Sequence, residues 1–152
     1  MIGQNFVESN CISVYLIRHA EKDRTNKNDK NPHLNEKGIQ RSIKWKSFFK
    51  NISFDKFYST NFNRTIETIQ PISEGEDITI YNPLNINYDD FIKLNKGNIV
   101  LVVGHSNTIP IFANNLLGKF VYHDIEDDNN SNLYVINICD GNKPTSSLYF
   151  VE

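Results

Sequence analysis

The sequence lacks most of the features that mark unusual classes of protein. Its 152 residues include two cysteines, one methionine and one tryptophan, and no apolar run approaches the length of a membrane span. Lysine and arginine total 16 against 18 aspartates and glutamates, which gives a net charge of −2. The chain therefore has no overall positive field that would favour nucleic acid or an anionic membrane, and we expect neither as a partner. A site for an anion has to be a local cluster.

The two cysteines are too few and too far apart to suggest a disulfide framework. We expect Cys11 and Cys139 to be buried strand residues, reduced rather than bonded to each other. Residues 1–10 lack the charged start and apolar core of a signal peptide. The cytoplasm is therefore the expected location.

The composition is that of an ordinary globular protein, with 39% hydrophobic and 12% aromatic residues. Disorder of the whole chain is excluded by this apolar content. The length suits one domain, 1–152, with a sizeable buried core.

Short apolar strands alternate with amphipathic helices along the chain. Residues 98–103 are apolar from Ile99 onward and rich in β-branched side chains, which is typical of a strand buried on both faces. The other expected strands are 11–18, 54–59, 77–81, 133–138 and 147–151, and the expected helices are 35–51, 62–72, 88–94 and 107–117. This alternation predicts an α/β fold, a three-layer α/β/α sandwich with a mostly parallel central sheet and an antiparallel edge strand or hairpin.

Chemically active side chains follow three of these strands. Arg18 and His19 end the first strand, Arg64 lies in the first turn of the helix after the second, and His105 follows Gly104. In a doubly wound sheet these three ends lie at one edge and can form one pocket. Two guanidinium groups and two imidazoles suit a phosphoryl group, and we expect these four side chains to be catalytic.

Two other histidines and an acidic stretch do not follow the ends of the parallel strands. His33 lies beside Pro32 in a polar loop, and His123 precedes the acidic residues 124–128. We expect both histidines to be solvated and the acidic stretch to be a surface loop.

Four segments, in order, resemble the motifs of the histidine phosphatase superfamily, the phosphoglycerate-mutase-like enzymes. Residues 14–22 are similar to its strand ending in Arg-His-Gly or Arg-His-Ala, and residues 34–40 to its Leu-Thr-x-x-Gly-x-x-Gln helix start. Residues 59–68, which contain Arg64, and residues 102–107, which contain His105, resemble two further motifs. The resemblance covers about residues 12 to 112.

The resemblance implies a mechanism. His19 would attack phosphorus and become a phosphohistidine, while Arg18, Arg64 and His105 would hold the phosphoryl oxygens. Such chemistry depends mainly on positioning and electrostatics, so no metal or cofactor is required in principle. Neighbouring cations are expected to lower the pKa of His19 and keep it neutral. Water would then hydrolyse the N–P bond.

The general acid is not resolved by the motifs. Many relatives carry a glutamate in a long insertion after the third strand, whereas residues 82–98 contain none. Asp89, Asp90 and Glu21 are candidates, and Ser106 stands where one branch of the family has aspartate. The short connection leaves little material for a lid, which favours an open site with a broad or macromolecular substrate.

The sequence thus predicts a metal-independent phosphatase acting on phosphomonoesters or phosphohistidine, with a phosphorylated small molecule or a phosphoprotein as substrate. Glu21 and Asn107 are expected to contact the substrate. The alternatives are a phosphoglycerate-type mutase and a non-catalytic phosphate-binding regulatory module. A metal hydrolase using His19, Glu21 and His105 is disfavoured. The His-x-Glu spacing of His19 and Glu21 also occurs in zinc deaminases, but the Pro-Cys-x-x-Cys motif that accompanies it there is absent from this sequence.

Overall fold

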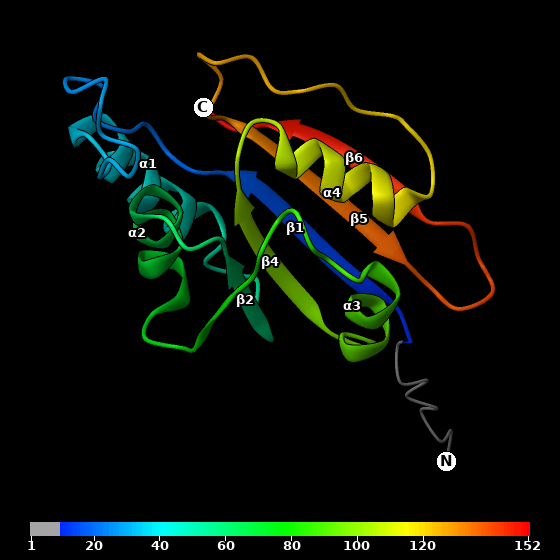
Figure 1. Ribbon diagram of the computed structural model, residues 1–152. Helices are drawn as coiled ribbons and strands as arrows, with labels where there is room; N and C mark the ends of the chain where they lie inside the picture. Colours follow the sequence, from blue (N-terminus) through cyan, green and yellow to red (C-terminus); the bar gives the residue numbers. More distant parts are fainter. Residues whose placement is uncertain (1–9) are drawn as a thin grey trace.

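A mixed sheet of six strands forms the centre of the molecule (Figure 1). The structure is a computed structural model that describes residues 10–152, so the prediction that residues 1–10 hold no signal peptide falls almost wholly outside the described residues. The strands are β1 (Ile12–Arg18), β2 (Lys56–Ser59), β3 (Ile78–Ile80), β4 (Ile99–Gly104), β5 (Asn132–Ile138) and β6 (Thr145–Phe150). The helices are α1 (Glu36–Phe48), α2 (Asn63–Ser73), α3 (Tyr88–Leu94) and α4 (Thr108–Leu117).

The strands are arranged in the order β3-β2-β4-β1-β5-β6. The first four strands of the chain run parallel, β5 runs antiparallel to β1, and β6 runs antiparallel to β5. The late strands therefore form the hairpin that the sequence predicts, with β6 at the edge. The expected α/β fold with a mostly parallel sheet is confirmed.

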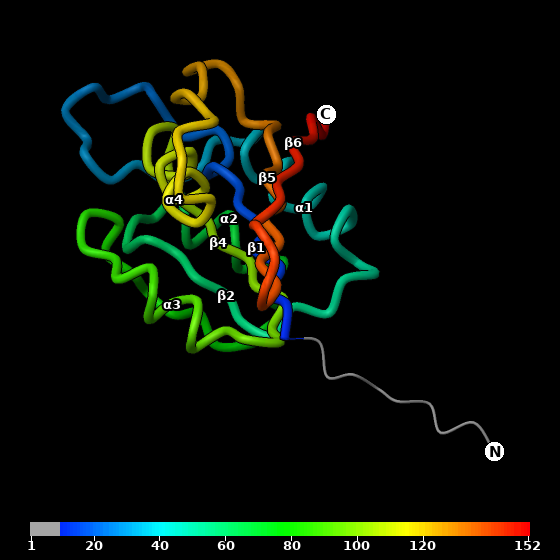
Figure 2. The backbone as a smooth tube through the Cα atoms, turned by 90° about the vertical axis from the view of Figure 1, so that its right-hand side faces the viewer, coloured from blue at the N-terminus to red at the C-terminus, as the bar shows by residue number. Residues whose placement is uncertain are grey.

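Two apolar cores lie on opposite faces of the sheet. Side chains alternate along a strand, so Val14 and Leu16 of β1 face α4, while Ile17 faces the other way. Trp45 of α1 and Ile69 of α2 pack with Ile17 in the second core. Figure 2 shows α3 and α4 on one side of the sheet and α1 on the other, which confirms the three-layer sandwich.

The helix ends follow local signals in the sequence. Asn35 caps α1, where its side-chain oxygen accepts a hydrogen bond from the Gly38 N–H at 2.8 Å. Gly118 ends α4 in the left-handed conformation, with φ of 70°. Gly38 also allows a close approach, because a Cβ at this position would lie 2.0 Å from the carbonyl oxygen of Glu21. The start of α1 is thereby packed against the segment that follows His19.

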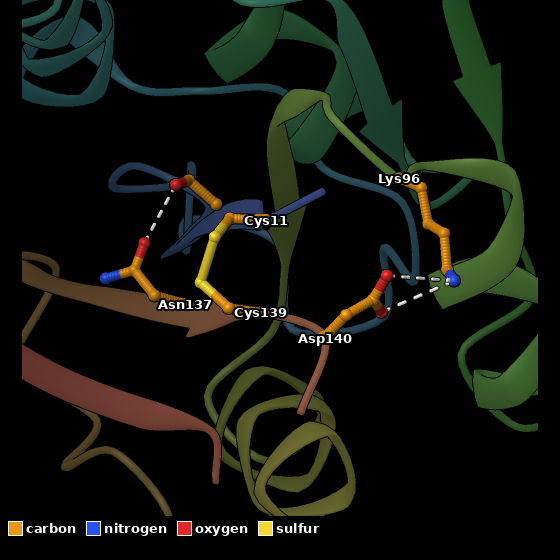
Figure 3. Close-up of a disulfide and its surroundings, with 6 residues drawn as sticks. Cys11, Lys96, Asn137, Cys139 and Asp140 are labelled. Carbon is orange, nitrogen blue, oxygen red and sulfur yellow. Dashed lines mark hydrogen bonds and ion pairs between the residues drawn. A yellow bond between two sulfur atoms is a disulfide. The ribbon is translucent and has the colours of Figure 1, made fainter. Parts of the chain in front are cut away.

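The prediction of reduced cysteines is wrong. Cys11 and Cys139 form a disulfide, shown in Figure 3, and both are only half-buried. The cause is the antiparallel pairing of β1 with β5, which places Ile12 opposite Ile138 and so brings the two flanking cysteines together, with Cα atoms 4.0 Å apart. Disulfides persist mainly in oxidising compartments, so the expected cytoplasmic location loses the support of reduced cysteines.

The part of the chain that the structure describes contains no helix that is both long and apolar enough to cross a membrane.

Reduction of the Cys11–Cys139 bond should destabilise the fold without impairing the candidate site. The bond closes a loop with a sequence separation of 128 residues, and a loop of that size corresponds to a loss of about 5 kcal/mol in the free energy of unfolding. The measurement is urea denaturation with and without reductant, with Cys139→Ser as a variant that reductant should no longer affect. An unchanged midpoint in the reduced native protein would contradict the bond.

Candidate active site

The three predicted strand ends meet at one edge of the sheet. β4 lies between β1 and β2, and the register sets Arg18 opposite Gly104 and Ser59 opposite Val103. The rings of His19 and His105 consequently lie 5.5 Å apart, centroid to centroid. Arg18 and Arg64 are both close enough to lower the pKa of each histidine. The four residues expected to be catalytic are therefore brought together.

His19 is held on both sides through its backbone. Its N–H donates to the Gly104 carbonyl at 2.9 Å, and its own carbonyl accepts from the Asn130 side-chain amide at 3.0 Å. The ring Nδ1 lies 2.7 Å from the Ala20 carbonyl. A carbonyl can only accept, so Nδ1 carries the proton in the neutral ring, and Nε2 keeps its lone pair. Nε2 is therefore the ring atom that is available to act as a nucleophile.

Both histidines are neutral at physiological pH. Burial, and then the charges of Arg18, His105 and Arg64, lower the pKa of His19 to about 3, although the hydrogen bond to Ala20 acts in the opposite direction. Burial and the nearby arginines lower the pKa of His105 to about 4. The expected direction of the His19 shift is confirmed, but burial contributes more than the cations that the sequence led us to name.

Arg18 is anchored by the loop that contains the acidic stretch. Its Nη1 donates to the carbonyls of Glu126, Asp127 and Asn129 at 3.1, 3.0 and 2.7 Å. The Asp127 carboxylate lies 3.4 Å from Nη2 and is otherwise exposed. The acidic stretch is thus a surface loop, as expected, and it also positions a site residue. Among residues 10–152, the buried Nε of Arg18 has no hydrogen-bond partner.

Arg64 lies in the first turn of α2, where the helix dipole also favours an anion. Its guanidinium carbon sits 4.6 Å from the ring centroid of Phe62. Its Nε and Nη1 are buried and find no hydrogen-bond partner in the described chain. Buried N–H groups are rarely left unpaired, because the loss of their hydration costs about 1–3 kcal/mol each. The unpaired donors of Arg18 and Arg64 could pair with the oxygens of an oxyanion.

Sequence reasoning missed three contributors. The ring of Phe62 contacts both Arg64 and His105, the latter at 5.2 Å between centroids. The Thr60 hydroxyl lies 2.9 Å from Nε2 of His105. Burial, and then the charges of Arg64 and Arg24, lower the pKa of Lys22, which adds a further cation beside the site. All three residues lie within the segments that resemble the family motifs. Their position in these segments was the only sign in the sequence that they contribute to the site.

Glu21 is engaged by Arg41. Both of its oxygens accept from Arg41 Nε, at 3.0 and 2.9 Å, and one accepts from Nη2 at 2.9 Å. Burial raises the pKa of Glu21, but these bonds and the charge of Arg41 together bring it below its usual value. The carboxylate is therefore ionised at neutral pH and does not serve as a proton donor. Within the described residues, no group of three or more histidine, cysteine, aspartate or glutamate side chains could hold a metal ion.

Asp89 and Asp90 are not brought to the site. They are exposed in the first turn of α3. This helix lies near the start of β1, whereas His19 follows the end of that strand (Figures 1 and 2). The residues after α3 confirm this position, because the Ser13 N–H donates to the Asn98 carbonyl at 3.1 Å.

Asn107 is exposed and caps α4, with its side-chain oxygen accepting from the Thr108 N–H at 2.9 Å. Its contact with substrate stays a prediction.

His33 and His123 are exposed, as expected. His33 is nevertheless paired with Glu67 at 2.6 Å, and the His123 ring packs against Phe120. Gly104 packs tightly against Tyr81 and Ile109, whose side-chain atoms would lie within 3.0 Å of a Cβ there, so a larger residue would displace these side chains.

Comparison with known proteins agrees with this geometry. The family model described as histidine phosphatase superfamily (branch 1) matches residues 14–85. Among curated proteins, none matches the chain.

Several solved structures share the fold over nearly their whole length. A phosphoserine phosphatase from Entamoeba histolytica, in complex with 3-phosphoglyceric acid, is 18% identical with a TM-score of 0.72 and covers 93% of this chain and 97% of its own. The protein histidine phosphatase SixA, complexed with tungstate, is 14% identical with a TM-score of 0.71 and covers 91% and 96%. A phosphoglycerate mutase from Bacillus anthracis is 17% identical with a TM-score of 0.67 and covers 95% and 94%.

The family model and the shared fold thus confirm the resemblance that the motifs indicate: residues 14–85 match the histidine phosphatase superfamily, and the chain shares the fold of the solved structures above.

Proposed function

We propose that the chain is a metal-independent phosphatase formed by a single domain, with His19 as the nucleophile. The observation that carries the proposal is the free Nε2 of His19 next to unpaired, buried donors of Arg18 and Arg64. Nε2 attacks phosphorus in line, the bond from phosphorus to the leaving group breaks, and a phosphohistidine forms. Water then attacks phosphorus, the N–P bond breaks, and inorganic phosphate and neutral His19 are released. Arg18 and Arg64 stabilise the equatorial oxygens as charge develops.

We infer that the substrate is a phosphoprotein, with phosphohistidine favoured, and that simple phosphomonoesters are also accepted. No carboxylic acid predicted as a proton donor is held in place to protonate a poor leaving group, since Glu21 pairs with Arg41 and α3 lies near the start of β1. Imidazole leaves readily once protonated, so it needs little help from an acid. The protein histidine phosphatase SixA shares the fold, which is consistent with such a substrate.

The position of the segment that would have to supply a lid also favours a protein substrate. The segment between β3 and β4, which would have to supply a lid, packs through Tyr88 and Phe91 against Phe112 of the α4 core. A mutase has to retain and reorient its phosphorylated intermediate, which requires a closed site. Because the segment between β3 and β4 packs against α4, it does not form the lid that would close the site.

Replacement of His19 by alanine should abolish hydrolysis of p-nitrophenyl phosphate, because no other atom supplies the nucleophile. The native protein should be inhibited by orthovanadate and remain active with a chelator, and acid-labile phosphate should be trapped on His19 in rapid-quench experiments. His123→Ala is the matched control, since this histidine is exposed in a loop. Activity in the His19→Ala variant would refute the mechanism, loss of activity to the chelator would support metal chemistry, and phosphate binding without turnover would support a regulatory module.

Replacement of Arg64 by alanine should lower kcat by about 10²- to 10³-fold, because it removes donors to the transition-state oxygens. Arg64→Lys should recover part of the loss, since it keeps the charge but not the forked geometry. Steady-state kinetics with p-nitrophenyl phosphate measure both variants. Equal rates for Arg64→Ala and the native protein would remove Arg64 from the site.

The two buried histidines should make stability pH-dependent. Their folded pKa values, about 3 and about 4, lie below the ordinary value of 6.5, so the unfolded chain binds more protons between these limits. Stability is therefore fully present above about pH 6.5 and is lost as pH falls from there toward the folded pKa values. Urea denaturation at several pH values measures the effect, and His19→Ala should weaken the dependence. An NMR titration of His19 with a midpoint near 6.5 would contradict the expectation.

A further inference from the structure

The peptide unit that joins His19 to Ala20 is held from opposite sides by two buried side chains. The Asn130 side-chain amide donates to the His19 carbonyl at 3.0 Å, and the Ala20 N–H donates to the Thr68 hydroxyl oxygen at 2.9 Å. The peptide is trans, so its C=O and N–H point in opposite directions. Thr68 is completely buried and Asn130 is 7% exposed, so water competes little for either contact.

The direction of each hydrogen bond at Thr68 is fixed by the chemistry of its partners. A backbone N–H can only donate, so the Thr68 oxygen accepts from Ala20. A carbonyl can only accept, so the Thr68 hydroxyl donates its proton to the Arg64 carbonyl, at 2.6 Å. Thr68 thus connects the backbone directly after His19 to the first turn of α2, where Arg64 lies.

The position of this peptide determines how the His19 ring is oriented. The Ala20 carbonyl lies 2.7 Å from Nδ1 of the ring, and this contact leaves Nε2 free. Rotation of the peptide between His19 and Ala20 would displace that carbonyl, and the ring would lose its fixed orientation. The ring is therefore oriented in part by two side chains that hold the backbone beside it.

The elements that supply these two side chains also hold the two arginines of the site. Asn130 belongs to the loop whose carbonyls bind the Arg18 guanidinium, and Thr68 lies one helical turn after Arg64 on α2. The nucleophile and the two guanidinium groups consequently share the same supports, which fixes their relative positions.

We propose that Thr68 is a positioning residue: together with Asn130, it holds Nε2 of His19 in line with the phosphorus atom of a bound phosphoryl group. The proposal rests on the proposed function, which makes His19 the nucleophile. Loss of the Thr68 hydroxyl should impair the attack on phosphorus and leave the oxyanion donors in place. The Arg64 carbonyl would still accept the helical hydrogen bond from the N–H four residues later.

The first test measures the rate of phosphohistidine formation by rapid quench with p-nitrophenyl phosphate. Valine has nearly the shape of threonine without its hydroxyl, so Thr68→Val should lower this rate about 10- to 100-fold, because a small displacement of a reacting atom is costly. Thr68→Ser keeps the hydroxyl and should restore most of the rate. Thr79→Val, on the exposed strand β3, is the matched control and should have the native rate. A native rate in Thr68→Val would overturn the proposal.

Two inhibitors separate positioning from general damage to the site. Inorganic phosphate can pair with the guanidinium groups without a bond to His19, so its Kd, measured by isothermal titration calorimetry, should be the same in Thr68→Val as in the native protein. Orthovanadate can take a fifth ligand and thus bond to Nε2 in the geometry of the transition state, so its Kd should rise about tenfold. Equal losses of affinity for both anions would mean that the substitution merely disrupts the site, and would overturn the proposal.

Hydrogen exchange tests the contact itself, independently of turnover. Relative to the Leu101 amide in the buried strand β4, the Ala20 amide should exchange about tenfold faster in Thr68→Val than in the native protein or in Thr68→Ser. The two proposals fail separately. A protected Ala20 amide without any turnover in the native protein would refute the phosphatase, whereas turnover that is lost in His19→Ala but indifferent to Thr68→Val would refute the positioning role alone.

Discussion

The parallel pairing of β1 with β4 is the constraint on which the candidate site depends. It sets Arg18 opposite Gly104, and the His19 N–H then continues the ladder to the Gly104 carbonyl. One register therefore fixes the distance between the two histidines, although His19 and His105 are 86 positions apart in the sequence. A shift of one residue would turn Val14 and Leu16 away from α4 and toward the core on the opposite face, so the packing of both cores protects the geometry of the polar site.

Around this frame, the site combines fixed positive charge with neutral imidazoles. Burial keeps both histidines uncharged, so the positive charge that faces an oxyanion comes from arginine and lysine. Arginine suits this role because it stays charged when buried, and the loop carbonyls that bind Arg18 hold its fork in place. Several of the guanidinium N–H groups of Arg18 and Arg64 nevertheless remain unpaired in the described chain, and the proposed oxyanion would pair with these groups.

Much of the fold and part of the candidate site could be predicted from local patterns in the sequence. The apolar run at 98–103 predicts a doubly buried strand, and Asn35, Asn107 and Gly118 mark helix ends because capping depends on a few neighbouring residues. The three strand ends could be assigned to one edge because parallel strands share their direction. The disulfide could not be predicted, because it depends on which strand pairs with β1 on its second side. Similarly, Glu21 appeared available in the sequence, and only packing of α1 places Arg41 against it.

The sequence by itself determined the α/β class, the ends of the strands and the choice of candidate site residues, which are Arg18, His19, Arg64 and His105. These features follow from periodicity, capping and short motifs. Only the tertiary structure decided the Cys11–Cys139 bond, the capture of Glu21 by Arg41, the place of α3 near the start of β1 and the threonine contacts of His105. These features depend on strand order, on the packing of one layer against another and on which hydroxyls are buried. Such long-range geometry arises when the chain folds, and no local pattern encodes it.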